Sequence, residues 1–301
     1  MSRIHEALKK AEQERALSQP DSRVESTRAG VQVAEAVAAV APALSGVTQG
    51  AAFTVESLLT RTRQARWSPD SKFMLFFGTE EHASGMEEFR TLRSRLYQAR
   101  EKQQLSRLLI TSALPKEGKS FTAANLAQVL ARQHGRRVLL IDGDLRNPQL
   151  HNLLGSERGT GLFEYLRGEA DEFSIIERGQ MENLFFISAG SSTSDPAELL
   201  ANGRLRHLLS RLEPMFDWII IDSAPVIPVS DAVLMAHDCD GVLLVVRSNS
   251  TPTDAARRAR REFADRNVVG VVLNGITPEH SPYSQYYYTA YTQHAKSQSK
   301  N

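Results

Sequence analysis

The first part of the chain has a hydrophobic pattern unlike the rest. Ile4, Leu8 and Ala11 recur at the spacing of one helix face, which predicts a short amphipathic helix within residues 1–17. Residues 18–71 have no stable period in most of their length and are rich in Ala, Ser, Thr, Gly and Gln. We expect a flexible linker there, with a small packed subdomain as the alternative.

Strands and helices alternate through the remainder of the chain. Short apolar runs rich in β-branched residues predict strands at 107–112, 137–142, 184–188, 218–222, 242–246 and 268–273. Stretches with a helical period predict helices at 119–133, 195–212, 230–236 and 253–265. Near-continuous apolar strands separated by helices favour an α/β fold with a doubly wound, mainly parallel sheet. Ligands of such sheets lie at the carboxyl ends of the strands.

A further helix is expected just before the first of these strands. Its apolar positions share one face: Phe89, Leu92 and Leu96. Its charged positions Glu87, Arg90 and Arg93 are three residues apart and share the other face. These charged residues form either a contact surface or exposed salt bridges that contribute little.

Composition excludes several classes of protein. The 301 residues carry 36 Lys and Arg against 35 Asp and Glu, a net charge of +1, which excludes a chain-wide basic footprint for nucleic acid. Cys239 stands alone, so no disulfide framework or cysteine-ligated metal is expected and a reducing cytosol is the natural compartment. We expect no membrane-spanning helix and no secretory signal, because no long apolar run occurs.

The segment Ala113–Ser120 reads Ala-Leu-Pro-Lys-Glu-Gly-Lys-Ser, between a predicted strand and a predicted helix. This is the setting of a P-loop, whose backbone N–H groups face phosphate oxygens, although Ala113 replaces the usual first glycine. Lys119 would reach the β- and γ-phosphates and Ser120 would bind Mg²⁺. The alternative is an ordinary lysine-containing helix start. The expected nucleotide contacts are Ala113, Lys116, Glu117, Gly118, Lys119, Ser120 and Phe121.

Acidic residues end two other predicted strands. Asp142 and Asp144 follow one apolar run, and Asp222 follows another in the manner of a Walker B strand. A single aspartate at such a place is usually a turn or helix-capping residue. Three such motifs in one doubly wound order predict nucleotide binding.

These motifs resemble those of the bacterial tyrosine kinases of exopolysaccharide synthesis, which share P-loop ancestry with partition and septum-positioning ATPases. The resemblance spans about 72–301, with Asp195–Leu200 matching a strand-to-helix segment of the family. It implies a P-loop kinase domain over 72–280 and a tyrosine-rich tail over 281–301. The start, Met1–Leu17, resembles the subgroup found beside exosortase-linked polysaccharide loci.

The resemblance and the residues together suggest roles in phosphoryl transfer from ATP. Lys119 and Mg²⁺ would neutralise charge on the transferring group, and Asp142 would activate the acceptor hydroxyl. Asp144 and Asp222 would organise Mg²⁺ and its waters. Asn274 would read the adenine edge, unless it is a turn residue before Gly275.

The tail carries five of the seven tyrosines of the chain, which the family uses as phosphate acceptors. They are Tyr283, Tyr286, Tyr287, Tyr288 and Tyr291. A 21-residue tail extends to about 70 Å at ~3.3 Å per residue, which permits transfer between neighbouring subunits. The alternative is a low-complexity terminus in which the tyrosines occur by chance.

The resemblance also implies partners. Glu87, Arg90 and Arg93 match an ExxRxxR helix through which family members assemble into rings. The fused transmembrane chain-length region of some members is absent, so we expect a separate membrane co-polymerase as activator, a tyrosine phosphatase as antagonist, and a cytoplasmic protein held peripherally at the inner face of the membrane. The basic segment Arg257–Arg261 is either a solvated helix face or a surface for a partner or anionic membrane.

One departure from the family and three rival functions bear on this interpretation. Lys116 stands where the family commonly has glycine, so it is strained if the position needs a positive φ. A partition-type ATPase switch would carry a lysine where Leu114 stands. A non-catalytic, nucleotide-gated regulator of polysaccharide assembly would use the same loop. Iron–sulfur relatives are disfavoured, because Cys239 alone supplies too few thiolates.

Overall fold

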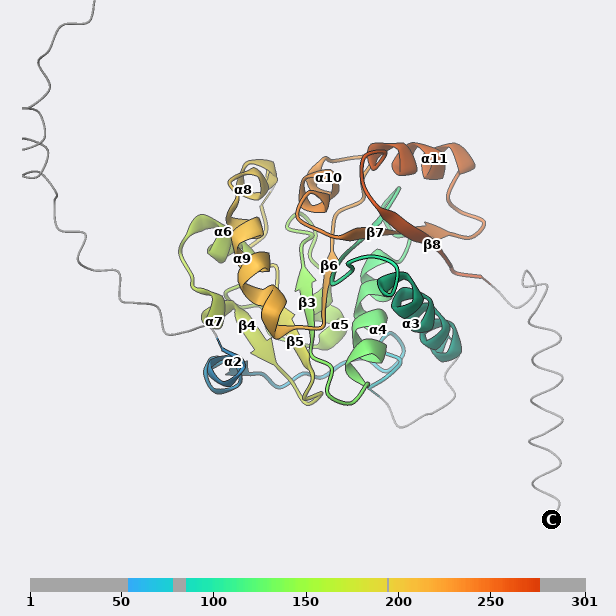
Figure 1. Cartoon of the computed structure of the whole chain (residues 1–301). Coiled ribbons are helices and arrows are strands. Elements are labelled where there is room, and N and C mark those ends of the chain that lie inside the picture. Colours follow the sequence, from blue (N-terminus) through green and yellow to red (C-terminus); the bar gives the residue numbers. More distant parts are fainter. Residues whose placement is uncertain (1–53, 78–84, 194, 277–301) are drawn as a thin grey trace, which may run out of the picture. The chain divides into compact units, whose positions relative to one another are not determined.

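The computed structural model describes residues 54–77, 85–193 and 195–276. Within these residues eight strands form one sheet, ordered β1-β4-β5-β3-β6-β2-β7-β8 (Figure 1). The neighbouring strands are parallel except that β4 runs antiparallel to β5. The strands are β1 Arg63–Gln64, β2 Arg107–Ser112, β3 Val138–Asp142, β4 Ile176–Arg178, β5 Leu184–Ile187, β6 Trp218–Asp222, β7 Gly241–Arg247 and β8 Val268–Asn274.

Helices cover both faces of this sheet (Figure 1). Strand residues alternate between two apolar clusters, so Leu109 packs on one side and Leu108 on the other. One side is covered by α3 Met86–Arg100, α4 Lys119–Ala131 and α5 Leu150–Leu154. The other is covered by α2 Val55–Arg61, α6 Leu162–Arg167, α7 Glu172–Ile175, α8 Ala197–Ala201, α9 Arg204–Leu212, α10 Asp231–Ala236 and α11 Thr253–Glu262, with the 3₁₀ turn η1 Glu213–Met215 after α9.

The expected doubly wound, mainly parallel sheet is confirmed. The predicted strands at 107–112 and 218–222 have the same bounds in the structure, and the other four differ by one or two residues. The helix expected over 195–212 is instead two helices, because Gly203 adopts a φ of 80° between them.

The boundary expected between linker and domain is too late in the sequence. Helix α2 and strand β1 lie within the expected linker 18–71, and β1 pairs with β4. Trp67 is buried, and its Nε1 donates to Glu177 Oε1 at 3.0 Å. The folded domain therefore includes residues before 72. The helix expected within 1–17 and the tail 281–301 lie outside the described residues.

Helix α3 has the two faces that its sequence predicts. Phe89 and Leu96 are buried against α4, and Leu92 packs beside them. In the described part of the chain, none of the helices combines the length and apolarity needed to cross a membrane.

Candidate nucleotide-binding site

The loop after β2 leads directly into α4 at the carboxyl edge of the sheet. Gly118 caps α4 with a φ of 96°, and its carbonyl accepts the first helical hydrogen bond, from Thr122 N at 2.9 Å. The opening N–H groups of any helix lack partners within it, so the first turn of α4 presents donors and a positive dipole end. This is the backbone geometry that binds phosphate.

Lys116 occupies the left-handed region of backbone space, with a φ of 64°. The positive φ considered from the sequence is therefore present, and lysine pays a steric cost there that glycine would not. The guanidinium of Arg247, at the end of β7, donates to the Lys116 carbonyl at 3.0 Å. This contact helps hold the strained turn.

Glu117 turns its carboxylate into the protein. It is 3% exposed, and its Oε2 accepts from Leu114 N at 2.9 Å across the loop. Its Oε1 contacts the Thr251 hydroxyl, while Asn274 Nδ2 donates to the Glu117 carbonyl at 2.9 Å. Glu117 therefore shapes the loop from within, through residues that follow β7 and end β8.

Arg247 and Thr251 were missed from the sequence. They lie about 130 residues beyond the loop, at separations of 131 and 134 residues from their partners, and match no motif. Asn274 was expected near the nucleotide, and the structure places it against the loop backbone. Its contact with adenine remains a prediction.

Lys119 lies among three carboxylates. Its Nζ is 2.8 Å from Asp144 Oδ2 and 3.4 Å from Ser120 Oγ. Burial lowers the pKa of Lys119, but the charges of Asp222 and Asp144 outweigh that effect and the pKa is raised overall. Lys119 therefore stays charged, as a group that binds phosphate must.

Asp142 and Asp222 lie side by side, because they are register partners on β3 and β6. Both are fully buried. Burial is the largest effect on each: it raises the pKa of Asp142 to about 8, helped by the Asp222 charge, and the pKa of Asp222 to about 6, opposed by the Lys119 charge. Asp142 Oδ2 accepts from Leu150 N at 2.9 Å.

The donor atoms here fit a divalent cation bound together with phosphates. Both carboxylate oxygens of Asp222 and Oδ1 of Asp142 are buried without a hydrogen-bond partner among the described residues. Those residues contain no group of three or more His, Cys, Asp or Glu that would hold a metal alone. Mg²⁺ takes few protein ligands and completes its shell with phosphate oxygens and water, so Ser120 and nearby carboxylates suffice.

The side chains of two expected nucleotide contacts, Phe121 and Ala113, pack into the protein. The ring of Phe121 packs edge-on against Phe89 of α3, with centroids 5.9 Å apart, so Phe121 would meet a phosphate through its backbone N–H. Ala113 is fully buried, and its carbonyl accepts from Ile227 N at 3.3 Å. Both residues would therefore contribute to the site through their backbone.

The ExxRxxR residues divide into two groups. Glu87 and Arg90 pair with each other on the exposed face of α3. Arg93 Nη1 instead donates to the Val129 carbonyl of α4 at 3.1 Å. Arg93 therefore has an intramolecular role in addition to any role in assembly.

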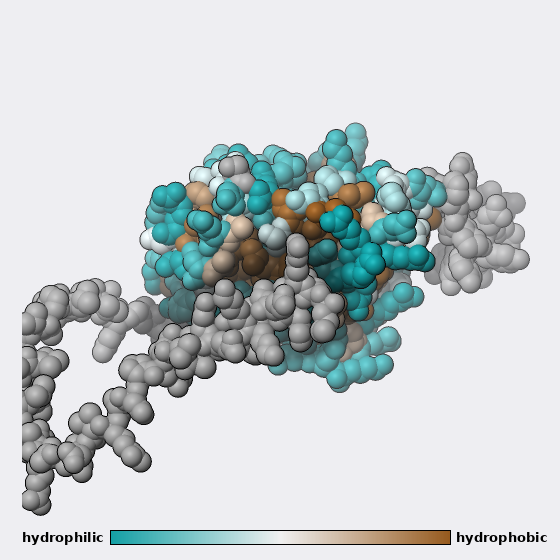
Figure 2. Space-filling model, turned by 90° about the horizontal axis from the view of Figure 1, so that it is seen from above, coloured by the Kyte–Doolittle hydropathy of each residue, from teal (hydrophilic) through white to brown (hydrophobic). Residues whose placement is uncertain are grey.

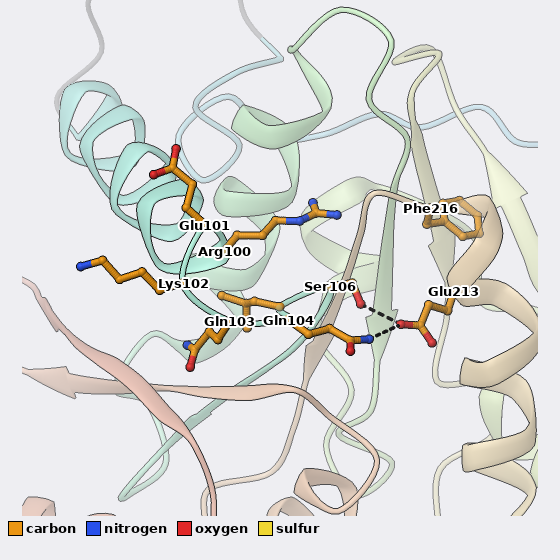
Figure 3. A pocket seen from close by; sticks show the side chains of 9 residues that line it. Arg100, Glu101, Lys102, Gln103, Gln104, Ser106, Glu213 and Phe216 are labelled. Atoms are coloured by element: carbon orange, nitrogen blue, oxygen red, sulfur yellow. Dashed lines mark hydrogen bonds between the residues drawn. The ribbon is translucent and has the colours of Figure 1, made fainter.

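A polar hollow of about 520 Å³ opens at the other end of β2 (Figure 3). Glu213 accepts there from Gln104 at 3.2 Å and from Ser106 at 3.1 Å. The residues before β2 line it, so it lies at the amino edge of the sheet. It is therefore separate from the loop 113–118 between β2 and α4, called the phosphate loop below. Its lining comprises Arg100, Glu101, Lys102, Gln103, Gln104, Leu105, Ser106, Glu213 and Phe216.

Comparison with known proteins agrees with this geometry. Residues 108–295 match the CbiA family, described as the CobQ/CobB/MinD/ParA nucleotide binding domain. The chain is 34% identical over 211 residues to tyrosine-protein kinase YwqD of Bacillus subtilis, a match covering 69% of this chain and 89% of YwqD. The chain belongs to the bacterial tyrosine-protein kinases.

Solved kinase domains share the fold of this chain. The kinase domain of the Escherichia coli tyrosine kinase ETK superposes with a TM-score of 0.65 at 32% identity, covering 73% of this chain and 87% of that domain. The full-length E. coli kinase etk is 35% identical over 195 residues, which cover 64% of this chain and 27% of that protein. This bacterial tyrosine kinase thus spans about a quarter of its longer relatives.

Proposed function

We propose that this kinase transfers the γ-phosphoryl group of ATP to tyrosines of its own C-terminal tail, between subunits of an oligomer. The observation that carries the proposal is the convergence of Lys119 with the buried carboxylates of Asp142, Asp144 and Asp222 beside the phosphate loop. The membership in a tyrosine-kinase family supports the choice of tyrosine as acceptor.

Each charged group then has a task. The Lys119 ammonium and the first turn of α4 would bind the β- and γ-phosphates. Ser120, Asp144 and Asp222 would hold Mg²⁺, which supplies charge neutralisation on the transferring group. Asp142 in its ionised form would take the proton of the tyrosine hydroxyl, and the raised pKa of about 8 makes that carboxylate a stronger base than an ordinary aspartate. The tyrosine O–P bond forms as the bond from the γ-phosphorus to the ADP oxygen breaks.

The acceptors proposed are Tyr283, Tyr286, Tyr287, Tyr288 and Tyr291, which lie outside the described residues. The exposed Glu87 and Arg90 on α3 would contribute to the assembly that brings a tail to a neighbouring site. Phosphates added to the tail carry about −1.5 to −2 charges each, which would disfavour re-entry into the site.

The setting proposed is regulation of exopolysaccharide polymerisation and export. A membrane co-polymerase would activate the kinase and recruit it from the cytoplasm to the inner face of the membrane, and a tyrosine phosphatase would reset it. The names of relatives support a tyrosine kinase, and the partners are part of the proposal.

Mass spectrometry tests the central step. The full chain is dephosphorylated, incubated with Mg²⁺ and ATP, and compared with Lys119→Ala. Phosphates on tail tyrosines in the unaltered chain alone would support the proposal. ATP binding without any tail phosphate, both alone and with the cytoplasmic segment of the membrane partner present, would contradict it and favour a partition-type switch or a nucleotide-gated regulator.

A further inference from the structure

A groove separates α11 from the outer strands β7 and β8, on the face away from α4. Its volume is about 480 Å³. The floor is apolar: Leu244 and Val246 come from β7, Val271 from β8, and Ala256 from α11. Leu244 pairs in register with Val271, so the floor is continuous across the two strands. Seen from the α10 and α11 side, hydrophobic surface gathers in the middle of the face with hydrophilic surface around it (Figure 2).

Arginines form one rim of this groove. Arg257, Arg260 and Arg261 line it from α11, at the three- and four-residue spacing that places them on one flank of the helix. All three are exposed, and within the described ranges none of them makes an ion pair. Arg258 does not line the groove and lies 4.0 Å from Glu262. The rim therefore carries uncompensated positive charge above an apolar floor.

This combination fits an aromatic phosphate ester. An aromatic ring buries apolar area against the floor, and a guanidinium binds phosphate oxygens through two parallel hydrogen bonds. ATP is the other phosphate ligand of this chain, and its loop follows β2 and opens α4, the helix on the opposite face of the sheet. The groove thus offers a second positively charged surface, on the face of the sheet opposite α4.

The sequence that follows β8 is rich in tyrosine. Val271 and Leu273 of β8 and Ile276 just beyond it are 60%, 52% and 46% exposed. Tyr283 follows Ile276 by seven residues, which span about 23 Å at ~3.3 Å per residue when extended. Val271 lines the groove, so the residues that follow β8 have the length to reach back to it.

We propose that the groove between α11 and β8 is a phosphotyrosine-binding site for the phosphorylated C-terminal tail. The inference rests on the proposed function only for the source of the phosphate. Before modification, no side chain of the tail 281–301 is acidic, so none pairs with Arg257, Arg260 and Arg261, and the tail stays available for transfer. After modification, the groove holds it on the outer edge of the sheet, away from the phosphate loop.

A synthetic peptide tests the groove without requiring catalysis. The peptide covers residues 280–292 with a phosphate on Tyr286, and its binding to the dephosphorylated full-length chain without nucleotide is followed by fluorescence anisotropy. We expect the phosphopeptide to bind at least about tenfold more tightly than the unmodified peptide, as charge-assisted hydrogen bonds to phosphate allow. Arg257→Ala combined with Arg261→Ala removes that preference.

Arg258→Ala is the matched control, because it removes the same charge from an arginine of α11 that does not line the groove. It should change the phosphopeptide affinity less than twofold. Equal affinity for the two peptides, or an equal loss in Arg258→Ala, would overturn the proposal. So would arginine-dependent binding to vesicles containing phosphatidylserine with no binding of the phosphopeptide, since the groove would then be a membrane surface.

The result is separable from that of the kinase experiment. A chain that binds the synthetic phosphopeptide but adds no phosphate to its own tail would refute autophosphorylation and leave the groove as a receptor for a tail modified by another kinase. A chain that phosphorylates its tail but does not distinguish the two peptides would keep the kinase and refute the groove.

Discussion

The Lys119 ammonium lies 2.8 Å from the Asp144 carboxylate, and the two side chains are only 11% and 4% exposed. The buried pair stands beside Asp142 and Asp222, so the lysine offsets the charge of more than one carboxylate. Removing one partner of a buried pair leaves an uncompensated charge, which is costly. The residue proposed to bind phosphate is therefore also a structural residue.

Lys119→Ala should abolish phosphotransfer and lower the free energy of unfolding by about 3 kcal/mol at pH 7, because it strands the Asp144 charge. Urea unfolding measures the stability, and the variant with both Lys119→Ala and Asp144→Ala should recover part of the loss. Lys116→Ala, which removes an exposed lysine from the same loop, is the control. Strictly additive losses in the double variant would show that the pair is not coupled.

Gly118→Ala should weaken ATP binding more than tenfold. The added Cβ would lie 1.9 Å from Asn274 Nδ2, so the contact of Asn274 with the Glu117 carbonyl would be lost. Gly135→Ala is the matched control, because Gly135 also has a positive φ, of 72°, but nothing lies within 4 Å of its added Cβ. Calorimetric titration with ATP measures the affinity of each variant. Similar affinities in Gly118→Ala and Gly135→Ala would refute a role for the Asn274 contact.

Lys116→Gly should stabilise the chain by about 1 kcal/mol, because glycine adopts a left-handed backbone without the steric cost that lysine pays. Asn249→Gly provides the comparison: Asn249 has a φ of 56°, close to the 64° of Lys116, and asparagine tolerates this region. Asn249→Gly should raise the free energy of unfolding, measured in urea, by less than Lys116→Gly does. A loss of stability in Lys116→Gly would mean that the lysine side chain contributes more than its backbone costs.

The contribution of Asp142 to stability should fall as pH rises from about 4 to about 8. Asp142 ordinarily has a pKa of 3.8, and burial raises that pKa to about 8 in the folded chain. Between these values the unfolded chain releases the proton while the folded chain retains it, so rising pH favours unfolding; above pH 8 both forms are ionised and the loss stops. Asp142→Asn should flatten this dependence in unfolding curves taken at several pH values, and an unchanged slope would contradict it.

Glu87→Ala and Arg90→Ala should disrupt an oligomer while leaving the subunit as stable as before, because the pair lies on the exposed face of α3. Arg93→Ala should in addition lower subunit stability by about 1 kcal/mol, since the Val129 carbonyl loses its donor. Light scattering with Mg²⁺ and ATP gives the assembly state, and thermal unfolding gives the stability. Unchanged assembly in all three variants would exclude this face as the contact surface.

The sheet and the carboxylates at its edge were predictable from the sequence, for a local reason. A run such as Val138–Asp142 predicts both a buried strand and the residue at which it ends. A carboxylate inside a buried strand is costly unless it is paired, so the acid marks the end of the apolar run. Parallel neighbours then bring Asp142 beside Asp222 without any further information. The acidic strand ends in the sequence and the parallel pairing of β3 with β6 therefore predict the same cluster of carboxylates.

Other features depend on contacts between distant residues and leave no local pattern. Trp67 lies in a segment of linker-like composition, and its burial depends on Glu177, 110 residues away. Strand β4 has three residues, too few to show a period. Thr251 looks like an ordinary loop residue until the fold places it against Glu117.

Asn274 lies between the phosphate loop, which its side chain contacts, and the C-terminal end of the described chain. Its side chain donates to the Glu117 carbonyl of the phosphate loop, and the described chain ends two residues later at Ile276, five residues before the tail 281–301. Thermodynamic linkage is reciprocal: if immobilising the tail shifts Asn274 and changes the affinity for nucleotide by some factor, nucleotide must change the affinity for the immobilised tail by the same factor. If the tail is phosphorylated as proposed, the end of β8 would couple the phosphorylation state of the tail to the affinity of the site for the next nucleotide.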